Sequence, residues 1–196
     1  SHDRPRILNV LAGNDGSDIP RDQRAHHRLS PEERMIGALR EQLMLRFIFS
    51  VPGMPCIYYG DEAGMEGCAD PFCRRTYPWG HEDAQVLARY QAMTAMRNAH
   101  PVLRTGECVY LAPCADVLGV IRKNESGRDA FGSQAENACA VTLINRSAKE
   151  VVVYLTEEDV CGAKTLVTDD GQTLSARGGA FSVKVKGLQG MTGFAE

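Results

Sequence analysis

The chain has 196 residues, of which 43% are hydrophobic and 24% are charged, and its formal net charge is −3. These values are ordinary for a soluble globular protein with a sizeable core, arranged as one large domain or two small ones. Because there is no long basic run, the composition gives no case for binding to nucleic acid or to an anionic membrane.

The longest apolar stretch, residues 43–59, is interrupted by an arginine, two prolines and a glycine, so it does not predict a membrane span. No secretory signal opens the chain. Seven cysteines, an odd number at scattered spacings, favour a reducing compartment over a disulfide framework. We therefore expect a cytoplasmic location.

The first fifty residues predict a polar start, a loop and a helix. Residues 7–11 could form a short helical turn, and residues 14–27 are expected to form an exposed loop whose adjacent histidines are solvated. Ser30-Pro31-Glu32-Glu33 is a strong helix start, with a Ser cap, Pro at the first position and Glu closing a capping box. An apolar stripe then predicts an amphipathic helix ending near Ser50. Its members are Ile36, Leu39, Leu43 and Phe47, widened by Met35, Met44 and Ile48.

The next segment predicts one αβ step of a barrel or sheet. Val51-Pro52-Gly53 breaks the helix. The apolar run Cys56–Tyr59 is too short for a helix and suits a buried strand. Gly60-Asp61-Glu62 ends this strand with two carboxylates, at the strand end where α/β folds collect their chemistry.

A long loop over residues 66–79 follows, of a kind that is usually functional or disordered in compact domains. Its aromatic residues argue against disorder. Cys68 and Cys73 are the only closely spaced cysteines, and no second Cys or His pair with ligand spacing accompanies them. Packed or idle thiols are therefore favoured over a metal site.

A second amphipathic helix is expected from about Asp83 to His100, and Pro101 stops it. Its apolar side carries Val86, Leu87, Tyr90, Met93 and Met96. Beyond Thr105 the pattern changes to six short β-type runs separated by turn-rich segments, which suggests an antiparallel sandwich. They are residues 107–111, 117–122, 138–144, 150–155, 165–167 and 181–186. We place the domain boundary between residues 1–104 and 105–196.

Two motifs resemble glycoside hydrolase family 13, the α-amylase family, and most closely its neopullulanase and cyclomaltodextrinase branch. Residues 53–65 with 70–79 resemble the family's eighth barrel strand and the loop after it. Ser1-His2-Asp3-Arg4-Pro5-Arg6 is similar to its motif Ser/Asn-His-Asp-Thr-Pro-Arg at the end of strand seven. The implied fold is the last part of a TIM (β/α)8 barrel followed by an all-β antiparallel sandwich.

The resemblance also implies site residues and a retaining mechanism. Asp3 matches the carboxylate that stabilises the transition state, and His2 matches a sugar-binding histidine. The other expected substrate-binding residues are Arg6, Asp70, Arg74 and Trp79. The implied substrate is an α-glucan with α-1,4 or α-1,6 bonds. We predict no metal ligands, and no calcium site is evident although the family includes calcium binders.

The nucleophilic Asp and the acid Glu of the family lie on earlier strands, which would precede Ser1. Asp61 and Glu62 are neighbours, so their side chains should diverge and cannot replace that pair. We favour a structural role for them, in hydrogen bonds to loop amides or in pairs with Arg74 or Arg75. This chain alone is therefore expected to be inactive.

Other points stay open at this stage. Arg4 replaces the usual Thr, and Thr76-Tyr77 also departs from the family pattern, which affects subsite preference. The aromatic residues Trp79, Tyr77 and Phe72 are equally suited to stacking on a sugar ring and to packing of the loop on itself.

The alternative function for the chain is a non-catalytic carbohydrate-binding or structural module. Apolar surface that a whole barrel would cover also suggests a homodimer.

Overall fold

The computed structural model describes residues 2–196. Ser1, the first residue of the opening motif, lies outside the described residues. By their internal contacts the residues group into two compact units, one of residues up to 42 with 56–92 and the other of residues 43–55 with 93–196. This division cuts both long helices, and the predicted domain boundary at residues 104 and 105 stays a prediction.

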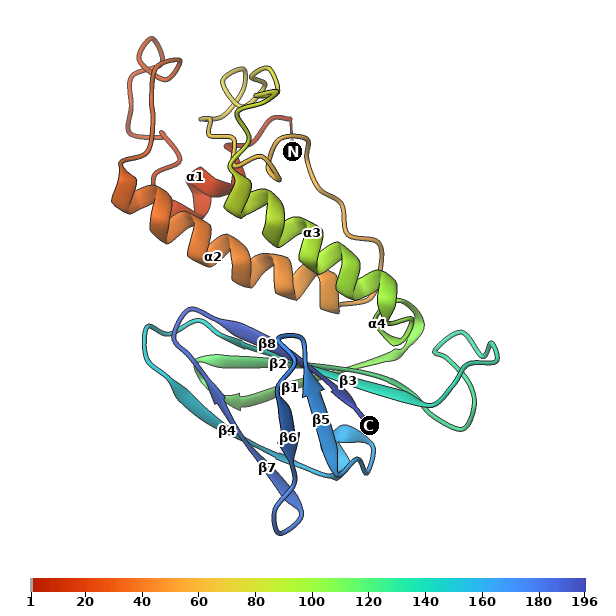
Figure 1. Ribbon diagram of the computed structural model, residues 1–196. Coiled ribbons are helices and arrows are strands. Elements are labelled where there is room, and N and C mark those ends of the chain that lie inside the picture. The colour runs from red at the N-terminus through yellow and green to blue at the C-terminus, as the bar shows by residue number, and fades with distance from the viewer. Residues whose placement is uncertain (1) are drawn as a thin grey trace. The chain divides into compact units, whose positions relative to one another are not determined.

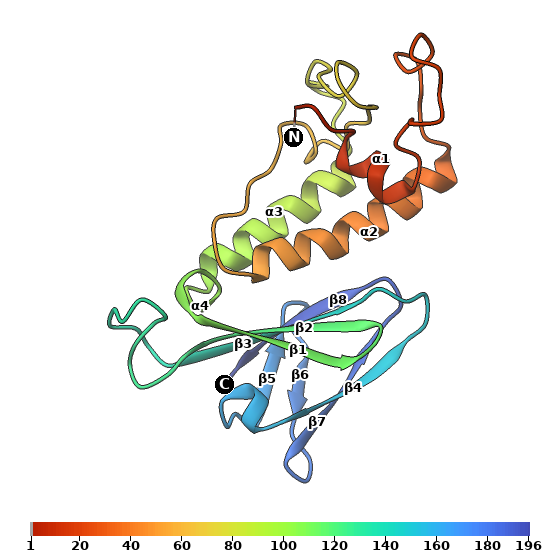
Figure 2. The same cartoon turned by 180° about the vertical axis from the view of Figure 1, so that it is seen from behind.

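The helical part contains two long and two short helices. They are α1 (Ile7–Ala12), α2 (Pro31–Ser50), α3 (Ala84–Ala99) and α4 (Val102–Thr105). The predicted capping box at the start of α2 is confirmed, since the Ser30 Oγ accepts from the Glu33 N–H at 3.2 Å and the Glu33 carboxylate accepts from the Ser30 N–H at 2.7 Å. Figures 1 and 2 both show α2 and α3 running side by side.

The second helix pattern is confirmed in its position and in its buried face. Asp83 caps α3, because its Oδ1 accepts from the N–H groups of Gln85 and Val86 at 3.1 Å. Val86, Tyr90 and Met96 are buried, as their spacing predicts. The stripe on α2 is only partly right. Leu43 is buried and Phe47 is half-buried, while Leu45 and Phe49, outside the predicted stripe, are buried as well.

A buried acid joins the two helices. Glu41 of α2 is 2% exposed, and its Oε1 accepts a hydrogen bond from the Tyr90 hydroxyl of α3 at 2.7 Å. The Oε2 atom has no hydrogen-bond partner within the described residues. Burial raises the pKa of Glu41 from 4.5 to about 7, since the ionised form loses its hydration.

We expect Glu41 to make the protein less stable as pH rises. Below pH 4.5 the acid is protonated in both states, but between pH 4.5 and 7 the unfolded state gives up the proton while the folded state keeps it. The free energy of unfolding should therefore fall by up to about 3 kcal/mol over this interval relative to Glu41→Gln, which keeps an acceptor for Tyr90. Urea denaturation at several pH values measures this difference. The exposed Glu32→Gln is the matched control, and parallel pH profiles for the natural chain and Glu41→Gln would refute the assignment.

The predicted strand at Cys56–Tyr59 is wrong for this chain, because the segment is irregular. Ile57 and Tyr59 are 37% and 42% exposed, so the segment is not buried either. Among the described residues, none of its backbone N–H groups has a protein acceptor. A strand exists only where a neighbouring strand pairs with it, and the described part of the chain supplies no partner here.

The remainder is an antiparallel β-sandwich, as predicted. Six strands form one sheet in the order β1-β2-β3-β8-β5-β6, and β4 pairs with β7 in the other. The strands are β1 (Glu107–Cys114), β2 (Val117–Asn124), β3 (Ala138–Asn145), β4 (Val151–Thr156), β5 (Thr165–Thr168), β6 (Thr173–Ser175), β7 (Ala180–Val185) and β8 (Gly190–Ala195).

The sandwich core lies between its two sheets. Val141 and Leu143 of β3 pack in one cluster with Leu155 of β4 and with Phe181 and Val183 of β7. On β7 these residues alternate with exposed positions, the period-two pattern of a strand with one wet face. The sequence did not predict β6 and β8, because β6 has three residues and two glycines interrupt β8.

Candidate functional site

Four of the predicted site residues lie close together, namely Asp3, His2, Asp70 and Arg74. The Asp3 carboxylate is 3.1 Å from His2 Nε2 and accepts from Arg74 Nη2 at 3.0 Å. The same Arg74 nitrogen is 2.7 Å from Asp70 Oδ1. The Asp3 side chain is 60% exposed, so the carboxylate is held in place and is still accessible to a ligand.

Hydrogen bonds also connect the backbone of the opening motif to the long loop of residues 66–79. The carbonyl of His2 accepts from Arg74 Nε at 2.9 Å and from the Cys73 thiol at 3.0 Å. The Arg6 N–H donates to the Gly67 carbonyl at 2.8 Å. The polar N-terminus is therefore ordered by residues about seventy positions later, which sequence spacing alone does not reveal.

Arg6 occupies a different environment from the other four residues. It is 1% exposed, and its guanidinium donates to the carbonyls of Cys73 and Tyr59 and pairs with Asp61 at 3.1 Å. The same group lies over the Tyr58 ring, 4.4 Å from its centroid. Arg6 of the opening motif therefore connects to the second family motif through buried contacts. Its contact with substrate stays a prediction.

The adjacent carboxylates Asp61 and Glu62 turn to different partners, as expected for neighbours in sequence. Asp61 turns to Arg6, whereas Glu62 Oε2 accepts from the Gly60 N–H at 2.8 Å. Burial raises the pKa of Asp61, and the Arg6 charge opposes that rise. Their structural role is confirmed. The expected partner was wrong for Asp61, which pairs with Arg6 rather than with Arg74 or Arg75.

Known proteins match the sequence of this chain over most of its length. The amylopullulanase of Thermoanaerobacter thermohydrosulfuricus is 33% identical over 191 residues, which is 97% of this chain and 12% of that protein. A cyclomaltodextrinase of Bacillus sp is 43% identical over 72 residues, 36% of this chain and 13% of that protein. The chain belongs to the α-amylase family. No protein-family profile matches it.

Solved structures agree with the fold of this α-amylase family chain. The α-amylase from Geobacillus thermoleovorans in complex with acarbose superposes with a TM-score of 0.75 at 18% identity. The match covers 100% of this chain and 37% of that structure. The chain therefore spans about an eighth of the length of the amylopullulanase and about a third of the solved amylase chain.

The positions that depart from the α-amylase family pattern lie on the surface or at a cavity. Arg4 and Thr76 are exposed, and Thr76 lines a cavity beside Arg75. Trp79 is 81% exposed, and its ring packs on that of Tyr77 with centroids 4.5 Å apart. The two aromatic rings therefore form an accessible pair. The Phe72 ring instead lies 6.0 Å from the Arg21 guanidinium.

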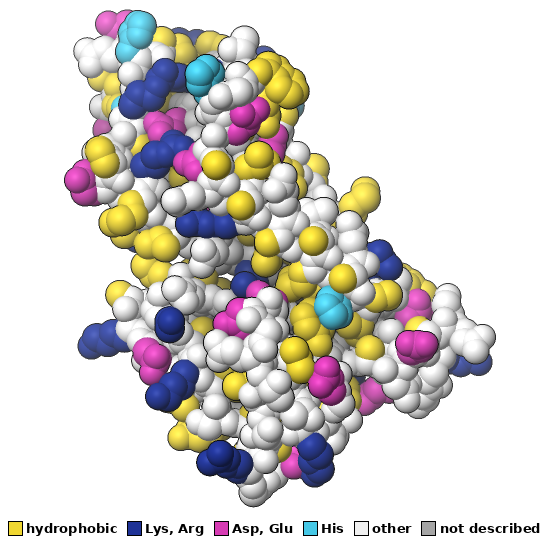
Figure 3. All heavy atoms as spheres, in the orientation of Figure 1, with side chains coloured by type: hydrophobic (Ala, Val, Ile, Leu, Met, Phe, Trp, Pro, Cys, Tyr) yellow, Lys and Arg dark blue, Asp and Glu magenta, His cyan; other side chains and the backbone are white. Residues whose placement is uncertain are grey.

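Residues 2–196 hold neither a metal-binding cluster nor a membrane-spanning helix. No cluster of three or more His, Cys, Asp or Glu side chains could hold a metal ion, and no helix has the length and apolarity to cross a membrane. All seven cysteines are free thiols, with Cys68 and Cys73 buried. On the face seen in Figure 3, positive and negative side chains are interspersed rather than gathered by sign.

Proposed function

We propose that this chain forms the carboxyl-terminal part of a retaining α-glucan hydrolase, of the α-amylase or neopullulanase type, in which Asp3 stabilises the transition state. The nucleophile and the general acid would come from a segment outside these residues, so the chain alone would be inactive. The observation that carries the proposal is the accessible Asp3 carboxylate held between His2 and Arg74.

The arrangement suits the chemistry that such a residue performs. Glycoside hydrolysis passes through an oxocarbenium-like centre that gains positive charge. A carboxylate already fixed by a guanidinium and an imidazole needs no reorganisation to stabilise that charge. His2 and Asp70 add polar groups that could bind sugar hydroxyls, and the exposed Trp79 could stack on a pyranose ring.

The segment Cys56–Tyr59 has the unpaired backbone and exposed side chains expected of a barrel strand without its neighbours. Its backbone N–H groups have no protein acceptor among the described residues, and the Ile57 and Tyr59 side chains are exposed. In a complete (β/α)8 barrel, strands on both sides would pair with this segment and helices would cover it. Two copies of this chain could cover the same surface instead, and light scattering distinguishes the two cases.

We also propose a substrate and a cellular location for the protein. The substrate would be a maltodextrin-like α-glucan, because the curated relatives are named as amylopullulanase and cyclomaltodextrinase and the solved amylase was crystallised with acarbose. Cleavage of α-1,6 as well as α-1,4 bonds would fit the amylopullulanase likeness. A cytoplasmic location would fit seven free thiols, and cell fractionation tests it.

The substitution Asp3→Asn tests whether Asp3 stabilises the transition state. In a protein that joins this chain to the missing barrel strands, the substitution should lower kcat on maltodextrin roughly 100- to 1,000-fold, because the amide cannot supply negative charge to the transition state. Release of reducing sugar measures the rate. Asp18→Asn, on the exposed loop, is the matched control. Activity that survives Asp3→Asn unchanged would exclude the role, and no activity in the joined protein itself would favour a binding module.

A further inference from the structure

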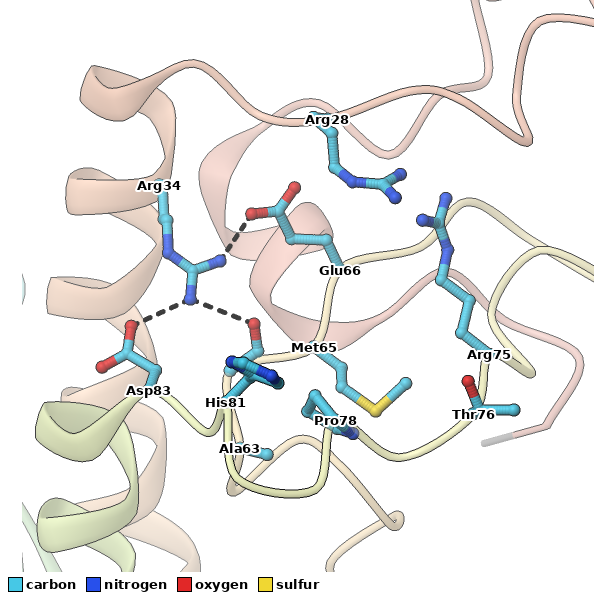
Figure 4. A pocket seen from close by; sticks show the side chains of 11 residues that line it. Arg28, Arg34, Ala63, Met65, Glu66, Arg75, Thr76, Pro78, His81 and Asp83 are labelled. Carbon is cyan, nitrogen blue, oxygen red and sulfur yellow. Dashed lines mark hydrogen bonds and ion pairs between the residues drawn. The ribbon is translucent and has the colours of Figure 1, made fainter.

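A cavity of about 460 Å³ opens beside the start of α2, and none of the residues that line it belongs to the Asp3 cluster, although Arg75 directly follows Arg74. It lies within one compact unit and is formed by residues 28–34, 63–66 and 75–83. Figure 4 shows charged side chains from all three segments facing it. The α-glucan chemistry proposed above uses none of them.

The two carboxylates of this cavity are already engaged. Arg34 pairs with Glu66 through Nη1 and with Asp83 through Nη2, the latter at 2.9 Å. The second Glu66 oxygen accepts from the Leu29 N–H at 2.9 Å. The second Asp83 oxygen caps α3. Both carboxylates therefore have their ion-pair partner in Arg34, although the Glu66 charge also opposes the lowering of the pKa of Arg75.

Arg28 and Arg75 face each other in the same cavity, and neither forms an ion pair with a residue in the described range 2–196. Figure 4 shows their guanidinium groups pointing toward one another. Within residues 2–196, no carboxylate lies within ion-pair distance of either one. With Arg34, Glu66 and Asp83, three arginines and two carboxylates leave one net positive charge on the lining, before His81 is counted.

The Arg75 guanidinium is fixed in this position by the protein. Its Nε donates to the Phe72 carbonyl at 3.2 Å and its Nη2 to the Ala25 carbonyl at 3.0 Å, which leaves Nη1 without an acceptor among the residues that the structure describes. Burial lowers the pKa of Arg75, and the Arg28 charge lowers it further. Two like charges held face to face at a cavity are unfavourable unless an anion lies between them.

We propose that Arg28 and Arg75 bind a phosphate group in this cavity, either free or carried by a sugar. Guanidinium groups donate paired hydrogen bonds that match phosphate oxygens. A tetrahedral phosphate can accept from two guanidinium groups that approach it from different sides. The cavity has room for a sugar attached to the phosphate, and Thr76 and His81 on its wall supply polar contacts.

Calorimetric titration of this chain with inorganic phosphate and with glucose 6-phosphate tests the proposal. Both should bind, glucose should not, and binding should weaken as sodium chloride is added. Tighter binding of glucose 6-phosphate would identify a sugar phosphate as the ligand, whereas equal affinities would identify the free phosphate group.

The variants localise the binding. Arg28→Gln should weaken phosphate binding roughly tenfold or more, because a charge-assisted contact is lost. Since the Arg28 side chain is exposed, this substitution is the one that should disturb folding least. Arg75→Lys should retain part of the affinity that Arg75→Gln loses. Arg40→Gln, on the exposed surface of α2, is the matched control. Absence of phosphate binding, or affinity unchanged in Arg28→Gln, would overturn the proposal.

Discussion

Arg6→Ala should destabilise the first compact unit by about 3–5 kcal/mol, since removal of one partner leaves the other charge of a buried pair uncompensated. Arg6 is 1% exposed, and Asp61 loses its only ion-pair partner among the described residues. The carbonyls of Cys73 and Tyr59 lose their donor as well. The opening motif should then detach from the loop that orders Asp3. Urea denaturation gives the loss of stability, and proton exchange of backbone amides in residues 2–9 gives the local detachment.

Two substitutions separate this effect from a general loss of positive charge. Arg4→Ala removes an exposed arginine two positions away and should change the free energy of unfolding by less than about 0.5 kcal/mol. Arg6→Ala combined with Asp61→Asn should recover part of the loss, because the buried charge is then gone. An Arg6→Ala chain as stable as Arg4→Ala would show that the pair does not hold the two motifs together.

Arg122→Met should cost a similar amount, about 3–5 kcal/mol, in the second unit. This β2 residue is 1% exposed and donates to the carbonyls of Ser50 at 2.9 Å, Leu103 at 2.7 Å and Gly106 at 2.7 Å. These carbonyls end α2 and α4, where the helix dipole favours a cation. Methionine fills much of the volume but leaves the carbonyls buried without donors. Thermal and urea unfolding measure the effect.

Arg128→Met is the control for this prediction, because Arg128 is exposed and its side chain donates to the carbonyl of Gly132 in the same loop. It should leave stability nearly unchanged. Arg122→Lys should be intermediate, since one ammonium cannot reach all the carbonyls that the planar guanidinium serves. Equal stabilities for Arg122→Met and Arg128→Met would mean that water satisfies the helix ends and that Arg122 is dispensable.

Local signals predicted much of this structure because their physical causes lie within a few residues. The capping box at Ser30, the apolar spacing on α3 and the period-two pattern of β7 act over one or two turns or strands. The two family motifs were also readable, and the relationship they suggested is confirmed by relatives that match nearly the whole chain. The divergence of Asp61 and Glu62 followed from their adjacency.

The errors arose where the outcome depends on distant partners. Cys56–Tyr59 has the composition of a buried strand, but strand pairing comes from other segments, and no segment within residues 2–196 pairs with it. The motif of Arg6 gave no sign of its buried contacts with Asp61 and with the carbonyls of Tyr59 and Cys73, because those partners lie more than fifty positions later. Glu41 had no local signal, because its burial depends on Tyr90 of another helix.

The sequence by itself determined the helix limits, the β-sandwich class, the family and the identity of Asp3 as the residue to test. Only the tertiary structure decided which arginine pairs with which carboxylate. It placed Arg74 on Asp3 and Asp70, Arg6 on Asp61, and left Arg28 facing Arg75 at a cavity. The physical reason is that capping and periodicity are short-range, whereas the pairing of long charged side chains depends on which loops fold against each other.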